Sequence, residues 1–174
     1  VNSPQTSIFN KSKLLYGYHL AKEKIYKTKE IIVCEGYLDV IMLHQAGFNN
    51  AVATLGTALT KDHLPLLRRG EPRVILSYDG DKAGQNAAFK ASVMLSQNGF
   101  DGGVVIFENG ADPADMVKDR KIEKLEELFS NPTPFTNFAI SYIISSYNIN
   151  NPVEKQKALS EANEYLSSLS QLYQ

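Results

Sequence analysis

Four short, apolar runs rich in β-branched residues alternate with helix-like segments, and this alternation limits the possible folds more than any other feature. The runs cover residues 30–34, 51–54, 73–78 and 104–107. Runs of this length and composition are typical of buried parallel strands. Parallel neighbours need long crossover connections, and the intervening helical segments provide them. The sequence therefore predicts an α/β layer over about residues 30–120.

The segments between these runs have helical spacing and helix-terminating residues. Helices are predicted over residues 38–45, 61–69 and 82–97. The first two end before glycines, and Thr60 is a suitable capping residue for the second. The connections between strands are thus expected to be helical.

Both flanks of this layer are also expected to be helical. After Asp112-Pro113 the spacing is helical throughout, with an apolar stripe formed by Phe135, Phe138, Ala139, Tyr142 and Ile143. The chain before residue 30 has a helical pattern but too little apolar surface for a domain. The predicted fold class is α/β, a parallel sheet flanked by helices with an all-helical C-terminal appendage. We expect three parts, 1–29, 30–120 and 121–174, cut out of a longer protein.

Charge and cysteine content exclude several classes of protein. No apolar run approaches the ~18 residues that a membrane-spanning helix needs. Cys34 is the single cysteine, which excludes an internal disulfide and fits a reducing cytoplasm. Residues 1–30 carry six lysines against two glutamates, yet the whole chain has a net charge of −1. That balance argues against a stand-alone nucleic-acid binder that depends on bulk charge.

Acidic side chains follow three of the predicted strands. They are Glu35 and Asp39, Asp79 and Asp81, and Asp112 and Asp115. Because the carboxyl ends of parallel strands meet at one edge of a sheet, these acids are expected to converge there. Crowded carboxylates repel one another unless a cation neutralises them, and Mg²⁺ or Mn²⁺ prefers such oxygen ligands. The alternative interpretation is that each acid is a helix cap or a turn former.

Three segments with these acids resemble a known family. They are Glu35-Gly36-Tyr37-Leu38-Asp39-Val40, Ala53-Thr54-Leu55-Gly56-Thr57 and Tyr78-Asp79-Gly80-Asp81-Lys82-Ala83-Gly84. All three are similar to the Toprim domain of bacterial DnaG-type primases. Asn2-Ser3-Pro4-Gln5-Thr6, Phe9, Lys11 and Leu15-Tyr16-Gly17 resemble the primase segment that joins a basic N-terminal subdomain to Toprim. The resemblance covers about residues 1–130 and reaches the helical tail only loosely.

The resemblance implies a role for each matching residue. Glu35 matches an acidic catalytic residue, and Asp79 and Asp81 match a catalytic, metal-binding pair. Glu35 and Asp112 are also expected to hold the metal. Residues expected to face the nucleotide, the template or the active centre are Asn2, Lys11, Asp39 and Lys82, with Lys11 also catalytic.

The sequence departs from the family pattern at one position. Primases usually have Asp-Pro-Asp after the fourth strand, whereas this chain has Asp112-Pro113-Ala114-Asp115. Either Asp115 takes the place of the second acid as a metal ligand, or that ligand is lost.

The family further implies a function and partners. It synthesises short RNA primers on single-stranded DNA by metal-dependent nucleotidyl transfer, as part of the primosome in DNA replication. The expected partners are single-stranded DNA, ribonucleoside triphosphates and, through a region outside this chain, the replicative helicase. We expect a cytoplasmic monomer without membrane contact, and weak or no activity for these 174 residues alone.

Three other functions compete with this one. Toprim is shared with topoisomerases and nucleases, although none of the nine tyrosines has a recognisable nucleophile setting. Phosphatases with an Asp-x-Asp nucleophile usually have Thr or Val two residues beyond the second Asp, where this chain has Ala83. The third alternative is that the chain is a non-catalytic scaffold that docks a helicase.

Overall fold

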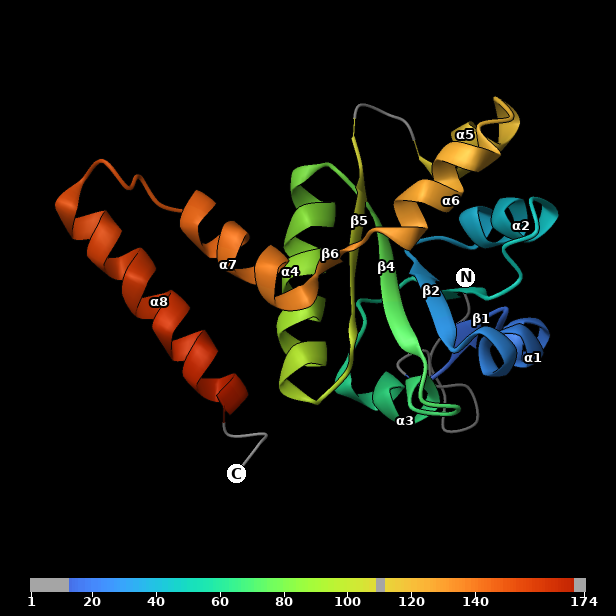
Figure 1. The fold of residues 1–174 in the computed structure, drawn as a ribbon, viewed down its shortest axis with the longest axis horizontal. Coiled ribbons are helices and arrows are strands. Elements are labelled where there is room, and N and C mark those ends of the chain that lie inside the picture. The colour runs from blue at the N-terminus through green and yellow to red at the C-terminus, as the bar shows by residue number, and fades with distance from the viewer. Residues whose placement is uncertain (1–12, 109–111, 171–174) are drawn as a thin grey trace.

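A six-stranded sheet forms the centre of the molecule in the computed structural model, which describes residues 13–108 and 112–170 (Figure 1). The strands are β1 (Leu15–Tyr16), β2 (Glu30–Cys34), β3 (Ala51–Thr54), β4 (Arg73–Asp79), β5 (Gly102–Phe107) and β6 (Thr133–Pro134). Their order across the sheet is β1-β3-β2-β4-β5-β6. The pairs β2–β3, β2–β4 and β4–β5 are parallel. The predicted α/β class is confirmed.

Helices cover both faces of the sheet. They are α1 (Tyr18–Thr28), α2 (Tyr37–Gln45), the 3₁₀ turn η1 (Lys61–His63), α3 (Leu64–Leu67), α4 (Lys82–Gln97), α5 (Pro113–Lys118), α6 (Ile122–Ser130), α7 (Phe135–Ser145) and α8 (Pro152–Ser170). One core packs α1, α3, α4 and α7 against the sheet, and a second core packs α2, α5 and α6 against the other face. None of the described helices is long and apolar enough to cross a membrane.

The side chains of β2 show how the sequence fills both cores. Ile31 and Val33 lie in the first core, whereas Ile32 and Cys34 lie in the second. Successive side chains of a strand point to opposite faces, so a strand covered on both sides needs a continuous apolar run. All four of these side chains are almost completely buried.

The sheet is mixed, which corrects the predicted parallel sheet. β1 pairs antiparallel with β3, and β6 pairs antiparallel with β5. Both edge strands lie in flanks that were expected to be helical. Each has only two residues, too few for an alternating pattern to show in the sequence. Pro134 is tolerated in β6 because an edge strand does not need every N–H for the ladder.

The predicted helix over 61–69 is also divided in the structure. Thr60 precedes η1, as expected of a capping residue, but α3 ends at Leu67. The predicted division into residues 1–29, 30–120 and 121–174 stays a prediction.

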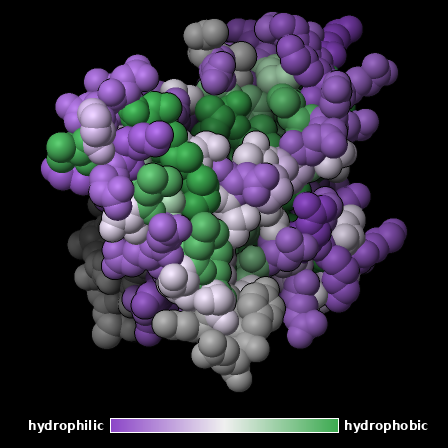
Figure 2. Space-filling view, turned by 60° about the vertical axis from the view of Figure 1, so that its left-hand side comes forward, coloured by the Kyte–Doolittle hydropathy of each residue, from purple (hydrophilic) through white to green (hydrophobic). Residues whose placement is uncertain are grey.

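The last two helices pack against the outer side of α4. Ala139 and Ile143 of α7 form a third core with Ala162 and Tyr165 of α8. The Tyr165 hydroxyl lies 2.7 Å from Ser96 Oγ of α4, within hydrogen-bond distance. Figure 1 shows α8 outermost on this side. Figure 2 shows that some hydrophobic residues stay at the surface of the molecule, as a band among hydrophilic ones. The apolar stripe predicted for this segment is thus mainly core, as its helical spacing indicates.

Candidate functional site

Glu35 and Asp79 lie at the point where the strand order reverses direction. β2 and β4 are neighbours in the sheet, with β3 on the far side of β2 and β5 on the far side of β4. Open parallel sheets bind ligands in the crevice at the carboxyl ends of two such strands. Glu35 directly follows β2, and Asp79 is the last residue of β4. The two strand ends are joined by a hydrogen bond in which the Asp79 N–H donates to Glu35 Oε1 at 2.7 Å.

Asp81 is held by the first turn of α4. It is the N-cap of that helix, and its Oδ1 accepts the Gly84 N–H at 2.6 Å. Gly84 lies so close to the strand end that a Cβ atom there would collide with the Asp79 carbonyl group. Glycine is needed at this position because the helix begins directly against the backbone of β4. The close approach fixes Asp79 and Asp81 relative to each other.

Asp112 and Asp39 come from the helices beyond the strand ends. Asp112 is the N-cap of α5, and its Oδ1 accepts the Asp115 N–H at 2.7 Å. Asp39 lies in the first turn of α2, where it accepts a hydrogen bond from the Ala114 backbone. Two of the predicted metal ligands, Asp81 and Asp112, are therefore helix caps, as the alternative interpretation of these acids proposed. Capping leaves the charge of each carboxylate in place.

Burial and neighbouring acids raise the pKa of three carboxyl groups at this edge of the sheet. Burial raises the pKa of Asp39 to about 6, helped by the charges of Asp112, Asp79 and Glu35 and opposed by the Ala114 hydrogen bond. Burial also raises the pKa of Glu35, and the charges of Asp79 and Asp81 add to the shift although the Asp79 N–H opposes it. The pKa of Asp79 is raised by burial first and then by Asp81 and Asp112. These five carboxylates form the acidic rim.

The acidic rim fits a hard divalent cation only in part. Within residues 13–108 and 112–170, no three His, Cys, Asp or Glu side chains are gathered tightly enough to form a ready-made metal site. Neighbouring acids nevertheless add to the burial that raises the pKa values of Glu35, Asp39 and Asp79, so the charges interact at longer range. Mg²⁺ is usually held by one or two carboxylates, several waters and substrate phosphates, so a loose set of acids suits it. The donor chemistry is thus compatible with such an ion.

The other predicted site residues have different positions. Asn2 and Lys11 lie outside the described residues. Lys82 is exposed on the first turn of α4, beside Asp81. Asp115 is exposed in the first turn of α5, and among the described groups it is not one of the charges that raise the pKa values of the rim. The replacement of the second acid by Asp115 stays a prediction.

A cleft beside Glu35 contains Lys90, which the sequence did not single out, and Thr57, which ends one of the segments similar to Toprim. It has a volume of about 410 Å³ and lies between the loop after β3 and one face of α4. Its lining includes Thr57 from the loop and Ala83, Ala87 and Lys90 from the helix. For Lys90, the available indication in the sequence was its spacing from Ala83 and Ala87, which places the three residues on one helix face.

A Toprim-like domain is recognised over residues 32–117, which include the acidic rim. The chain is 58% identical over its whole length to a DNA primase from Helicobacter pylori and spans 31% of that relative. It is 47% identical over 172 residues to a DNA primase from Campylobacter jejuni, spanning 28% of it.

Solved structures agree with this assignment. The fold matches the DnaG primase catalytic domain bound to single-stranded DNA with a TM-score of 0.86 and 32% identity, over 97% of this chain and 54% of that one. It also matches the RNA polymerase domain of Mycobacterium tuberculosis DnaG in complex with double-stranded DNA, with a TM-score of 0.75 and 33% identity, over 97% and 55% of the two chains. The chain therefore belongs to the DnaG-type DNA primase family and corresponds to the Toprim-containing part of its catalytic core.

Proposed function

We propose that this chain is the metal-dependent part of a DNA primase that synthesises RNA primers on single-stranded DNA. The observation that carries the proposal is the hydrogen bond between the Asp79 N–H and Glu35 Oε1 at the switch point of the sheet. It holds a family-matching glutamate against the Asp-x-Asp turn, at the edge of the sheet where ligands bind. The DNA held by two structurally similar primase domains supports a nucleic-acid substrate.

In this proposal the acidic rim holds one or more Mg²⁺ or Mn²⁺ ions through Glu35, Asp79, Asp81 and Asp112. When bound, such an ion lowers the pKa of the attacking hydroxyl and stabilises charge on the oxygens of the displacement. The reaction joins a primer 3′-hydroxyl to the α-phosphate of a ribonucleoside triphosphate and releases pyrophosphate. The remaining partner assignments, the helicase and the monomeric state, stay predictions.

The protein contributes a fixed arrangement of charges. The Asp79 N–H orients the Glu35 carboxylate, and the Gly84 N–H orients that of Asp81. Carboxylates that are already oriented need little reorganisation when charge develops on the substrate. Burial and the neighbouring acids raise the pKa of Asp39 to about 6, and a cation bound at the rim would lower it.

The test is template-directed RNA synthesis by a catalytic core that contains this segment. Asp79→Asn keeps the shape and the backbone hydrogen bond but removes the charge, so we expect a loss of about 100-fold or more in rate. Asp119→Asn, a change at an exposed acid at the end of α5, is the matched control and should leave the rate unchanged. Equal rates for the two variants would overturn the proposal. DNA cleavage without RNA synthesis would instead favour a nuclease or topoisomerase.

A further inference from the structure

The cleft beside Glu35 has opposite charges at its two ends. Glu35 contributes a carboxylate from the acidic rim, and Lys90 contributes an ammonium from the third turn of α4. The helix face between the rim and Lys90 carries only Ala83 and Ala87, whose small side chains leave room for a ligand. An elongated anion can therefore lie along α4 with one end near the rim.

Lys90 is available to bind such an anion. Its side chain is exposed, and within the described ranges it forms no ion pair. Arg73, by contrast, lies between two carboxylates. A lysine is a point charge on a flexible stem and commonly binds phosphate.

Thr57 supplies a second, independent observation. Its hydroxyl oxygen is buried, and no described residue hydrogen-bonds to it. A buried polar atom without a partner costs free energy, so few occur in folded proteins and each needs an explanation. Thr57 lines the same cleft as Lys90, and a ligand oxygen there would satisfy its hydroxyl.

We propose that Lys90 and Thr57 form a phosphate-binding subsite for the substrate that reacts at Glu35. The inference rests on the proposed function, whose substrates are polyanions. The acidic rim repels such substrates, and a cation at the far end of the cleft offsets that repulsion. The phosphate comes either from the triphosphate of the incoming ribonucleotide or from the backbone of the bound strand.

The two sources are separated by kinetics on a catalytic core that contains this segment. If Lys90 binds the triphosphate, Lys90→Gln should raise the KM for ribonucleotides about tenfold and leave the Kd for template unchanged. If it binds the backbone, the template Kd should rise instead, and the salt dependence should fall by about one phosphate contact. Lys155→Gln, a change at an exposed lysine on α8, is the control for charge alone. The subsite is excluded if the Lys90 and Lys155 variants have the same KM and the same Kd.

Thr57 variants exclude a merely structural role. Thr57→Val should raise the same constant as Lys90→Gln, either the KM for ribonucleotides or the Kd for template, by a smaller factor. Thr57→Ser keeps the hydroxyl and should leave that constant at the value of the original protein. The melting temperature should not fall in Thr57→Val, because the hydroxyl has no described partner to lose. A lower melting temperature with unchanged binding constants would show that Thr57 acts in folding alone.

Binding by the 174-residue chain tests the subsite without catalysis. The probes are inorganic triphosphate and a short oligothymidylate. Binding is followed by the changes in backbone amide chemical shifts. We expect shifts at Ala87 and Lys90 with one of the two probes and their loss in Lys90→Gln. If they occur but the core makes no RNA, the proposed function fails and the subsite stands. If the core makes RNA and neither probe shifts these amides, the subsite fails alone.

Discussion

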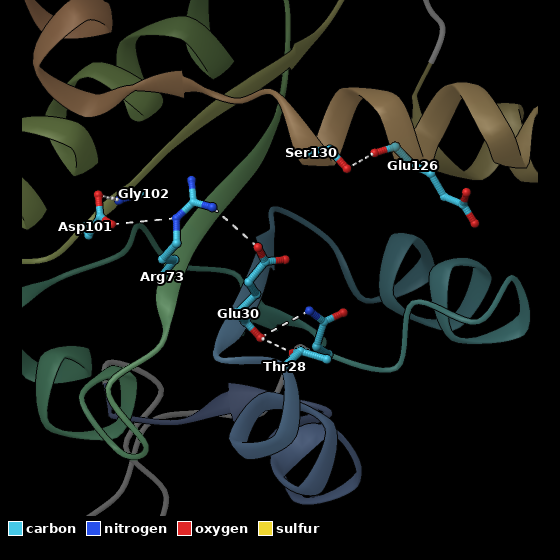
Figure 3. A network of polar contacts seen from close by, with 8 residues as sticks. Thr28, Glu30, Arg73, Asp101, Gly102, Glu126 and Ser130 are labelled. Atoms are coloured by element: carbon cyan, nitrogen blue, oxygen red, sulfur yellow. Dashed lines mark hydrogen bonds and ion pairs between the residues drawn. The ribbon is translucent and has the colours of Figure 1, made fainter.

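The two ends of the central sheet differ in how their acidic side chains are neutralised. At the amino ends of the parallel strands, Arg73 lies 3.4 Å from Glu30 and 3.7 Å from Asp101 (Figure 3). Asp101 also accepts the Gly102 N–H, and the Glu30 carbonyl accepts a hydrogen bond from Asn50. At the carboxyl ends, burial and neighbouring acids raise the pKa values of Glu35, Asp39 and Asp79.

This difference supports the proposed binding site at the carboxyl ends of the strands. The Arg73 pairs are partly exposed, so they contribute little to stability, but the guanidinium lies between Glu30 and Asp101 and offsets the repulsion between these two acids. The acidic rim keeps repulsion that a cation would relieve. A fold retains such repulsion at functional sites, where perturbed pKa values cluster.

The largest effect is expected from a change that separates the acids of the rim. Gly84→Ala should lower the free energy of unfolding by about 2 kcal/mol, because its Cβ would collide with the Asp79 carbonyl group. Primer synthesis should fall with it, since Asp79 and Asp81 would be displaced. Urea unfolding measures the first effect. The control is Gly36→Ala, whose Cβ would meet only Asp39 Oδ2 at 3.9 Å; equal stabilities would contradict the close approach.

The second-largest effect is expected on metal binding, which should differ between acids at the two ends of the sheet. Asp81→Asn keeps an oxygen to accept the Gly84 N–H but removes the charge, so Mn²⁺ binding should weaken about tenfold. Asp101→Asn at the opposite end should leave binding unchanged. Titration calorimetry on both variants makes the comparison, and an equal loss in the two would mean that the ion binds without preference for the rim.

The pH dependence of stability is a smaller effect. The pKa of Asp39 is raised to about 6 in the folded protein, so the folded state holds its proton more tightly than the unfolded chain. Without divalent cations, the free energy of unfolding should therefore fall as the pH rises from about 4 to about 6. Asp39→Asn removes this loss and should stabilise the protein by about 1 kcal/mol at neutral pH, after allowance for solvent screening.

Urea unfolding in EDTA on both sides of this pH range measures the effect. Asp119→Asn is the control, because that side chain is exposed and lies at the opposite end of α5 from Asp112. The explanation fails if Asp39→Asn keeps the pH dependence of the original protein.

The smallest effect is expected at the amino ends of the strands, where Arg73 forms its ion pairs. Arg73→Gln should lower the free energy of unfolding by about 0.5 kcal/mol, because its ion pairs are partly exposed. The difference should shrink in high salt, since screening weakens such pairs. A loss several times larger, insensitive to salt, would show that Arg73 holds the strands together by packing.

The central strands and the rim were predictable from local sequence. β2, β3 and α4 have the bounds that the apolar runs and helical spacing predict. Their patterns are long enough to carry a period. Glu35 directly follows β2, and Asp79 and Asp81 lie between the apolar run of β4 and the start of α4.

Features that depend on tertiary contacts were not predictable. β1 and β6 are strands only because a neighbouring strand pairs with them. Helix capping was an alternative interpretation of the acids in the sequence, but which of them cap, and through which N–H, depends on the backbone at the start of each helix, as at Asp81 and Asp112. Lys90 is an ordinary helical lysine in the sequence, and only the placement of α4 beside the loop after β3 brings it to the cleft.

The two-residue edge strands have a consequence for self-association. A long free strand edge offers backbone groups to another chain and promotes fibre growth. Here β1 covers the end of β3, and His44 Nε2–H donates to the Ala51 carbonyl at 2.9 Å, covering part of the rest. At the opposite edge, Pro134 has no N–H to donate. In the folded state, the described residues thus leave little free strand backbone for templated aggregation at either margin of the sheet.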